Sequence, residues 1–240
     1  MSSELTPSQE VETLERLVLR FAGDSGDGMQ LAGSRFTDAS ALFGNDLATL
    51  PNFPAEIRAP AGTIPGVSSF QVQISERDIL TPGDAPDVLI AMNPAALKAN
   101  LGDLRRGGLI LVNSDAFDDR NLEKAGYESN PLEDGSLRGY SVLQAPMEEL
   151  TKLAVADSGV KGRATLRSKN FFALGLVSWM FTRPLEPILE WIEDKFGSKP
   201  EVAAANTMAL KAGWNFGLTT EAFHHTYEVK PAQLPPGEYT

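Results

Sequence analysis

The first residues in the chain that could take part in chemistry are glycines, two aspartates and a serine, directly after an apolar segment, 17–22. They are Gly23, Asp24, Ser25, Gly26, Asp27 and Gly28. Glycine readily adopts positive φ and leaves neighbouring backbone N–H groups uncovered, and such groups at a helix N-terminus bind anions. The pattern therefore predicts a buried strand, a glycine loop and a helix start, and the loop becomes a candidate anion site.

Two well-known phosphate-binding loops fit this segment poorly. Dinucleotide loops space their glycines as GxGxxG, whereas the order here is GxxGxG, and the carboxylates of Asp24 and Asp27 would repel a pyrophosphate. A P-loop ends in GK[ST], but here Gly28 is followed by Met29 and Gln30. Neither an ordinary nicotinamide site nor an ATPase is expected.

A third match concerns Ser25. The tripeptide 23–25 (GDS) resembles the nucleophile block of GDS-type esterases, and a serine nucleophile requires a general base. The chain has only two histidines, His224 and His225, and both lie far along the sequence. A GDS-type serine hydrolase and a tight turn without any ligand therefore stay open as alternatives for this segment.

Composition excludes several kinds of function. The 240 residues carry a formal net charge of −11, which is unfavourable for binding nucleic acid. There is no cysteine, so the chain supplies no thiolate nucleophile, disulfide or ordinary iron–sulfur ligand, and two histidines are too few to favour a metal site. No apolar run reaches the roughly 20 residues of a membrane helix, and no secretory signal is visible, so a cytoplasmic location is expected.

Alternating strands and helices predict an α/β fold. We expect a three-layer α/β/α, Rossmann-like arrangement with a mostly parallel sheet and helices on both faces. The predicted strands are 17–22, 70–74, 87–92, 109–113 and 140–143, and the predicted helices are 29–43, 94–104, 147–155, 170–180, 185–196 and 202–216. Four prolines between Asn45 and Pro65 predict a rigid, extended loop there. Periodicity is lost from Thr219 onward.

The carboxyl ends of parallel strands collect ligands, so the glycine loop, Asn93 and Asn113 are expected at one edge of the sheet. Each asparagine fits either a ligand contact or an ordinary helix cap or turn. Arg58, in the proline-rich loop, is either an anion contact or half of a surface ion pair. The segment 161–169 holds four cations and no acid, which suits phosphate groups, an acidic partner or a solvated approach to a helix.

Four segments together carry a resemblance to a known family. They are 20–30 (RFAGDSGDGMQ), 54–62 (PAEIRAPAG), 87–94 (DVLIAMNP) and 167–170 (RSKN). In order and spacing they resemble the γ module of 2-oxoacid:ferredoxin oxidoreductases, most closely the N-terminal part of the α subunit of the 2-oxoglutarate enzymes. This implies a γ domain over 17–218, an N-terminal segment 1–16 that is disordered or contacts a partner, and a linker 219–240 toward a thiamine-binding module.

The resemblance also implies a reaction and its components. The family converts a 2-oxoacid and coenzyme A to acyl-CoA and CO2 and passes two electrons to ferredoxin. Thiamine diphosphate, Mg²⁺ and iron–sulfur clusters would be bound by the thiamine-binding α module and the β subunit. No catalytic residue is expected in this chain, which would help to form the coenzyme A site or serve purely as a structural assembly module. The candidate contacts are Ser25, Gly26, Asp27, Gly28, Arg58, Lys169 and Asn170.

Overall fold

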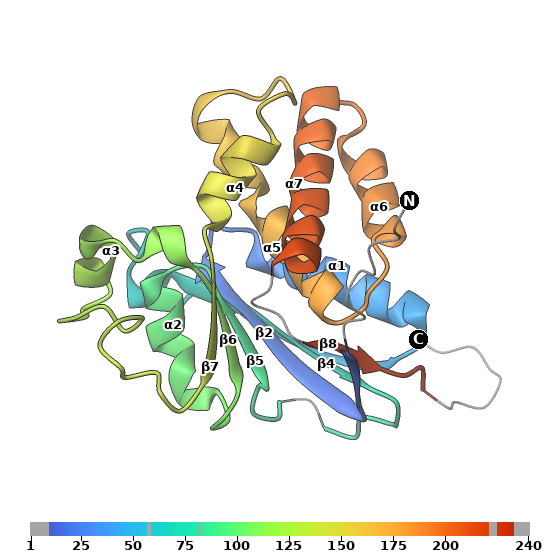
Figure 1. The fold of residues 1–240 in the computed structure, drawn as a ribbon, viewed down its shortest axis with the longest axis horizontal. Coiled ribbons are helices and arrows are strands. Elements are labelled where there is room, and N and C mark those ends of the chain that lie inside the picture. Colours follow the sequence, from blue (N-terminus) through green and yellow to red (C-terminus); the bar gives the residue numbers. More distant parts are fainter. Residues whose placement is uncertain (1–9, 57–58, 82, 221–224, 233–240) are drawn as a thin grey trace, which may run out of the picture.

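A six-stranded sheet forms the centre of the protein (Figure 1). The computed structural model describes residues 10–56, 59–81, 83–220 and 225–232. The strands lie in the order β3-β4-β2-β5-β6-β7, and only β4 runs against the other five. Their bounds are β2 (Arg16–Asp24), β3 (Asp46–Asn52), β4 (Val67–Ser75), β5 (Val88–Ala91), β6 (Leu109–Asn113) and β7 (Ser141–Ala145).

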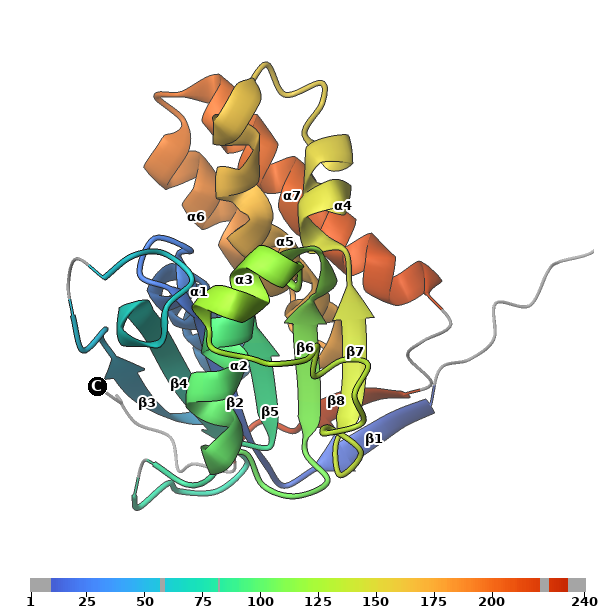
Figure 2. The same ribbon diagram turned by 90° about the vertical axis from the view of Figure 1, so that its left-hand side faces the viewer.

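Helices cover both faces of this sheet (Figures 1 and 2). On one face α1 (Met29–Phe43) packs against β2 and β4, with α4 (Met147–Ala154), α5 (Lys169–Met180), α6 (Glu186–Phe196) and α7 (Pro200–Thr219) beyond it. On the other face lie α2 (Pro94–Asn100) and α3 (Asp119–Lys124). Short 3-10 helices span Ile64–Gly66, Leu101–Asp103, Ser114–Ala116 and Gly162–Ser168. The predicted three-layer α/β fold with a mostly parallel sheet is confirmed.

Helices α5 and α7 cross at two glycines. A Cβ atom on Gly175 would lie 1.9 Å from the Leu210 carbonyl oxygen, and one on Gly213 would lie 1.9 Å from the Phe172 oxygen. The backbones therefore touch where no side chain fits, and α5 is buried along almost its whole length. Although α5 is apolar, no helix in the described ranges combines the length and hydropathy needed to cross a bilayer.

Two sequence-based expectations about local structure were wrong. Residues 46–52 lie inside the segment predicted to be an extended loop, yet they form β3, which pairs antiparallel with β4. Pro51 is tolerated because β3 is an edge strand, where a missing N–H need not break a ladder. The helix predicted over 94–104 ends at Asn100, because the backbone tightens into the 3-10 turn Leu101–Asp103 before Gly107.

A separate pair of strands comes from the two ends of the chain. β1 (Glu10–Leu14) and β8 (His225–Val229) pair in parallel, with Glu10 opposite His225 and Leu14 opposite Val229. Both lie in segments for which no packed element was expected, and Val229 is buried in the core. Short polar segments give a weak strand signal, since pairing between distant parts of the chain decides their structure. The domain limits 17–218 are not tested by this and stay a prediction.

Candidate functional site

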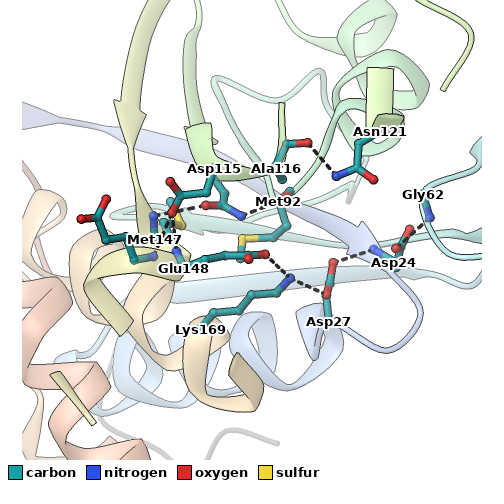
Figure 3. Close-up of polar contacts among 12 residues, drawn as sticks. Asp24, Asp27, Gly62, Met92, Asp115, Ala116, Asn121, Met147, Glu148 and Lys169 are labelled. Carbon is teal, nitrogen blue, oxygen red and sulfur yellow. Dashed lines mark hydrogen bonds and ion pairs between the residues drawn. The ribbon is translucent and has the colours of Figure 1, made fainter. Parts of the chain in front are cut away.

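The glycine loop lies where β2, β5 and β6 end side by side. Because these strands are adjacent and parallel, the loop after Asp24, the residue Asn93 after β5, and Asn113 at the end of β6 emerge at the same edge, as predicted. Figure 3 shows the polar side chains that meet there. Among those labelled, four are carboxylates (Asp24, Asp27, Asp115 and Glu148) and one is a cation, Lys169.

The glycine loop is closed by hydrogen bonds between its two aspartates. The Asp24 N–H donates to Asp27 Oδ2 at 3.0 Å, and the Asp27 N–H donates to the Asp24 carbonyl oxygen at 2.9 Å. The next residue, Gly28, has φ +74° and caps the N-terminus of α1 without a side chain. The two aspartates therefore shape the loop itself, an arrangement that their charge alone did not indicate.

Lys169 links this loop to a second helix. Its ammonium group lies 3.0 Å from Asp27 Oδ1 and 3.5 Å from Glu148 Oε1, in the first turn of α4 (Figure 3). The three side chains are only 17%, 14% and 25% exposed, respectively. Burial lowers the pKa of Lys169, but the two carboxylates outweigh burial and raise its pKa above the usual value. Lys169, at the start of α5, is therefore a charged link between the glycine loop and α4.

Gly28 and Asn170 are in direct contact. A Cβ atom on Gly28 would lie 2.4 Å from Asn170 Nδ2, so only glycine fits beside this asparagine. Asn170 is 5% exposed, and its Oδ1 accepts a hydrogen bond from the Phe171 N–H at 3.0 Å. The structure therefore brings Asp27 and Gly28 together with Lys169 and Asn170, whereas Ser25 and Gly26 lie exposed at the tip of the loop.

Asp24 fastens the proline-rich segment to the glycine loop. Its Oδ2 accepts a hydrogen bond from the Gly62 N–H at 2.9 Å, and the Ser25 N–H donates to the Gly66 carbonyl oxygen at 3.2 Å. The other oxygen, Asp24 Oδ1, is buried without a well-aligned partner, although the nearby Asn93 amide favours its charged form. Burial nevertheless raises the pKa of Asp24, with the Asp27 charge adding to it.

The two asparagines at the strand ends have structural partners. Asn93 caps α2, its Oδ1 accepting from the Ala96 N–H at 2.8 Å, so the helix-cap interpretation is confirmed. Asn113 is fully buried and bridges strand and helix, donating to the Met92 oxygen and accepting from the Met147 N–H. Because both side chains already bind protein groups, this geometry does not support their interpretation as ligand contacts.

Sequence reasoning placed Asp115 at this edge, after the strand 109–113, but it predicted neither the role of the Asp115 carboxylate nor that of Glu148. Asp115 Oδ2 accepts from the Glu148 and Glu149 N–H groups, both at 2.9 Å, and so caps α4 from a different loop. A carboxylate there is stabilised by the positive end of the helix. Asp115 and the start of α4 are more than 30 positions apart, so no local sequence pattern predicts this cap. Glu148 could have been found, because it is an acidic residue in the first turn of a helix that directly follows a parallel strand.

Three of the four cations in the segment 161–169, called the basic segment below, have no ion-pair partner among the described residues. Lys161, Arg163 and Arg167 are exposed and make no ion pair with any residue that the structure describes, while Lys169 at its end is occupied. Most of the segment is the 3-10 helix Gly162–Ser168, which leads directly into α5. Arg58, the remaining candidate, lies outside the described residues.

Ser25 has no general base among the described residues. It is exposed, and no hydrogen bond joins its hydroxyl to another group within the described ranges. His224 and the side chain of His225 lie outside the description. The contact that the structure shows for Ser25 is made by its backbone, whose N–H donates a hydrogen bond to the Gly66 carbonyl oxygen.

Comparisons with known proteins agree with this architecture. The chain is 64% identical over 228 residues to the 2-oxoglutarate oxidoreductase subunit KorA of Mycobacterium tuberculosis, covering 95% of this chain but 35% of KorA. It is 33% identical over 110 residues to the 2-oxoglutarate synthase subunit KorC of Methanothermobacter thermautotrophicus, covering 45% of this chain and 55% of KorC.

Solved structures show the same fold. The 2-oxoglutarate:ferredoxin oxidoreductase from Magnetococcus marinus, with 2-oxoglutarate, coenzyme A and succinyl-CoA bound, matches with a TM-score of 0.69 and 26% identity, over 92% of this chain and 34% of that one. A keto/oxoacid ferredoxin oxidoreductase γ subunit from Geobacter sulfurreducens matches at 20% identity and a TM-score of 0.56, over 83% of this chain and 99% of that one. The family model for pyruvate ferredoxin/flavodoxin oxidoreductase matches residues 18–216. The chain therefore belongs to the pyruvate ferredoxin/flavodoxin oxidoreductase family.

Proposed function

We propose that the chain is the γ module of a cytoplasmic 2-oxoglutarate:ferredoxin oxidoreductase. This enzyme would convert 2-oxoglutarate and coenzyme A to succinyl-CoA and CO2, with two electrons passing to ferredoxin. The observation that carries the proposal is the 64% identity to KorA across 95% of this chain. Because the chain spans 35% of KorA, the reaction is proposed for the whole enzyme, with partner modules present. We expect the chain to be inactive alone.

The partner modules would supply the redox chemistry. Thiamine diphosphate with Mg²⁺ would supply the electron sink for decarboxylation, and iron–sulfur clusters would carry the electrons, in a thiamine-binding module and a β subunit. The absence of cysteine from this chain is consistent with that division. The chain's own part would be to bind and orient coenzyme A and to hold the modules together.

The contact surface that we propose is the edge described above. It comprises Ser25, Gly26, Asp27, Gly28, Lys169 and Asn170. Arg58, which lies outside the described residues, is proposed as a further contact on the sequence alone. The exposed residues Ser25 and Gly26 would approach the ligand or the neighbouring module, while Asp27, Lys169 and Asn170 would hold them in place. Four carboxylates at this edge make the loop a poor site for the phosphates themselves.

The phosphates of coenzyme A would instead lie along the basic segment. Lys161, Arg163 and Arg167 are exposed without ion-pair partners in the described ranges, so their charges are available to an anion. Guanidinium groups bind phosphate through paired hydrogen bonds, and three nearby cations suit a ligand with several phosphate charges. The segment joins Lys169, so phosphates bound there would bring the rest of the ligand to the glycine loop.

The second candidate is a purely structural module. It is favoured by the tight internal bonding of Asp24, Asp27 and Lys169, which shapes the edge without any ligand. In that case the basic segment would bind an acidic protein surface, and the enzyme would depend on it for assembly and not for affinity toward coenzyme A.

The test measures KM for coenzyme A and kcat in the assembled enzyme. In one variant Lys161, Arg163 and Arg167 are all changed to Gln, and in the control three exposed lysines elsewhere, Lys195, Lys199 and Lys211, are changed to Gln. We expect KM for coenzyme A to rise about tenfold or more in the first variant only, with kcat little changed. Unchanged KM with loss of the assembled complex on size exclusion would favour the structural module.

A further inference from the structure

The strands β1 and β8 form an incomplete sheet. A parallel pair is slightly less stable than an antiparallel one, and sheets built only of parallel strands are normally covered on both faces. Two strands alone are marginal, and a third strand or a covering element is needed for independent stability. Here β1 pairs with β8 alone, and no described residue pairs with its other edge, called the open edge below (Figure 2). Backbone groups at such an edge can pair with another chain.

Burial differs between the two strands. β8 packs against α5, and its last residue, Val229, is only 1% exposed. In β1, by contrast, Val11 is 53% exposed, and Glu12 and Thr13 are exposed as well. Successive residues of a strand point to opposite faces, so β1 is uncovered on both of its faces at these positions. The strand is therefore held mainly by its hydrogen bonds to β8.

The pair of strands is acidic. It carries Glu10, Glu12 and Glu228 and contains no lysine or arginine. Glu12 is exposed at the centre of β1, and no ion pair joins it to another described residue. Its charge acts on Tyr227, which lies opposite in the ladder: burial raises the pKa of Tyr227, and the Glu12 carboxylate raises it further. A strand added beside β1 would therefore be stabilised by a cation near Glu12.

A hollow of about 210 Å³ lies on the face of β1 that carries Glu12. It is lined by Glu12 and Leu14 from β1, by Tyr227 from β8, and by residues at the start of the central strands. Arg105 and Asp87 in its wall bond each other at 2.9 Å, so Glu12 is the charged lining residue without an ion-pair partner in the described ranges. A lysine or arginine from an added strand could lay its apolar stem along Leu14 and its charge beside Glu12.

Two other occupants of the open edge fit this chemistry poorly. The terminal segments 1–9 and 233–240 contain no lysine or arginine, and the second includes two adjacent prolines. A second copy of the chain would present its own β1. In the full antiparallel register of two β1 strands, Glu12 would lie directly opposite Glu12, and like charges placed in this way are destabilising.

We propose that the open edge of β1 is a docking site for an extended segment of a neighbouring enzyme module, which adds as a third strand and places a lysine or arginine beside Glu12. Backbone hydrogen bonds would supply affinity and the basic side chain selectivity, as in other cases of β-strand addition. β1 would then become the middle strand of a three-stranded sheet. The inference rests on the proposed function only in requiring that neighbouring modules exist.

Hydrogen exchange of β1, followed by mass spectrometry, tests the edge itself. We expect the amides of residues 11–14 to exchange at least about tenfold more slowly in the assembled enzyme than in the purified chain, because the added strand would protect those that point to the open edge. Equal exchange in the two samples would overturn the proposal. Protection in the purified chain that increases with its concentration would assign the edge to a second copy, and would overturn it as well.

Charge variants at Glu12 test the chemistry of the partner. Glu12→Lys should weaken binding of the chain to the rest of the enzyme about tenfold or more, because like charges would meet, and Glu12→Gln should weaken it by about fivefold or less. The matched control is Glu123→Lys, at an exposed glutamate of α3, which should bind like the wild type. In the purified chain no variant should unfold at a lower urea concentration than the wild type, which separates docking from folding.

The outcomes distinguish this inference from the proposed function. If partner modules bind and Glu12→Lys binds them like the wild type, the inference fails and the proposed function stands. If the chain binds no partner module, both fail. The KM for coenzyme A that tests the basic segment involves other residues, so its result does not decide the role of β1.

Discussion

Gly28 and Asn170 lie so close that a Cβ atom on the glycine would be 2.4 Å from Asn170 Nδ2. Gly28→Ala should therefore destabilise the protein by about 2 kcal/mol or more, from the φ of +74° together with the steric clash. Urea unfolding of the purified protein measures this.

The control for this prediction lies two residues away. A Cβ atom on Gly26 would have nothing within 4 Å, and its φ is not positive, so Gly26→Ala should change stability by no more than about 0.5 kcal/mol. Combining Gly28→Ala with Asn170→Ala should recover the steric part of the loss. Equal effects at the two glycines would contradict the assigned contact.

Lys169 should contribute to stability through its two carboxylate partners. Lys169→Met leaves Asp27 and Glu148 mostly buried without their cation, which should cost about 2 kcal/mol. Lys152→Met, at an exposed lysine of α4, should change the free energy of unfolding by less than about 0.5 kcal/mol. If the two variants unfold at the same urea concentration, the ion pairs of Lys169 with Asp27 and Glu148 do not stabilise the protein.

The crossing of α5 and α7 should not tolerate a methyl group. Gly175→Ala would place its Cβ atom 1.9 Å from the Leu210 oxygen, and the helices must separate to accept it. We expect a loss of about 3 kcal/mol, seen as a lower thermal midpoint. Gly102→Ala, where nothing lies within 4 Å, should be neutral or stabilising by up to about 1 kcal/mol. An unchanged midpoint for Gly175→Ala would show that the crossing is looser than described.

Asp24 should make stability fall as pH rises. Burial raises its pKa in the folded protein above the usual value of 3.8, so the folded state holds this proton more tightly than the unfolded chain. The stability that the group contributes is therefore present below 3.8 and is lost as pH rises through the folded pKa. In Asp24→Asn the side-chain oxygen can still accept a hydrogen bond from the Gly62 N–H. The stability of this variant relative to the wild type should therefore increase as pH rises from 3.8 through the folded pKa.

Asp134 should have the opposite effect on stability, which it should make rise with pH. Hydrogen bonds from Ser129 and Ser136 lower its pKa below 3.8, so its contribution is present above that value and is lost as pH falls through the folded pKa. Relative to wild type, Asp134→Asn should therefore lose stability as pH rises, whereas Asp24→Asn gains. Urea unfolding from about pH 3 to 7 compares the two. Parallel curves for the two variants would contradict the assigned shifts.

Much of the site edge was predictable because it depends on local signals. The apolar run before Gly23 and that before Asn93 predict adjacent buried strands, and parallel topology brings their ends together. The family resemblance gave Lys169 and Asn170, with the glycine loop, as candidate contacts to coenzyme A or a neighbouring module, which stays a prediction. Their contact with the loop, where Gly28 meets Asn170, is a finding of the structure. The strand predictions required only the pattern of neighbouring residues and the rule that adjacent parallel strands end at the same edge of a sheet.

The features that were not predicted from the sequence depend on contacts between residues far apart in the chain. Pro51 suggested a loop because proline removes a donor, yet β3 forms at the edge of the sheet, where pairing with β4 suffices. The cap that Asp115 provides to α4 and the bond of Lys169 to Glu148 join positions separated by more than a helix length. Patterns within a short window carry no information about such partners.

The parallel pairing of β1 with β8 has a consequence for synthesis on the ribosome. β1 is made first, but its partner, His225–Val229, emerges only after almost all the other elements. At typical translation rates of about 5–20 residues per second, the first strand waits roughly 10–40 s with both edges unpaired. The acidic residue Glu12 in its centre disfavours pairing with other nascent chains during this interval. The last step of folding would then be the return of the second strand to the first.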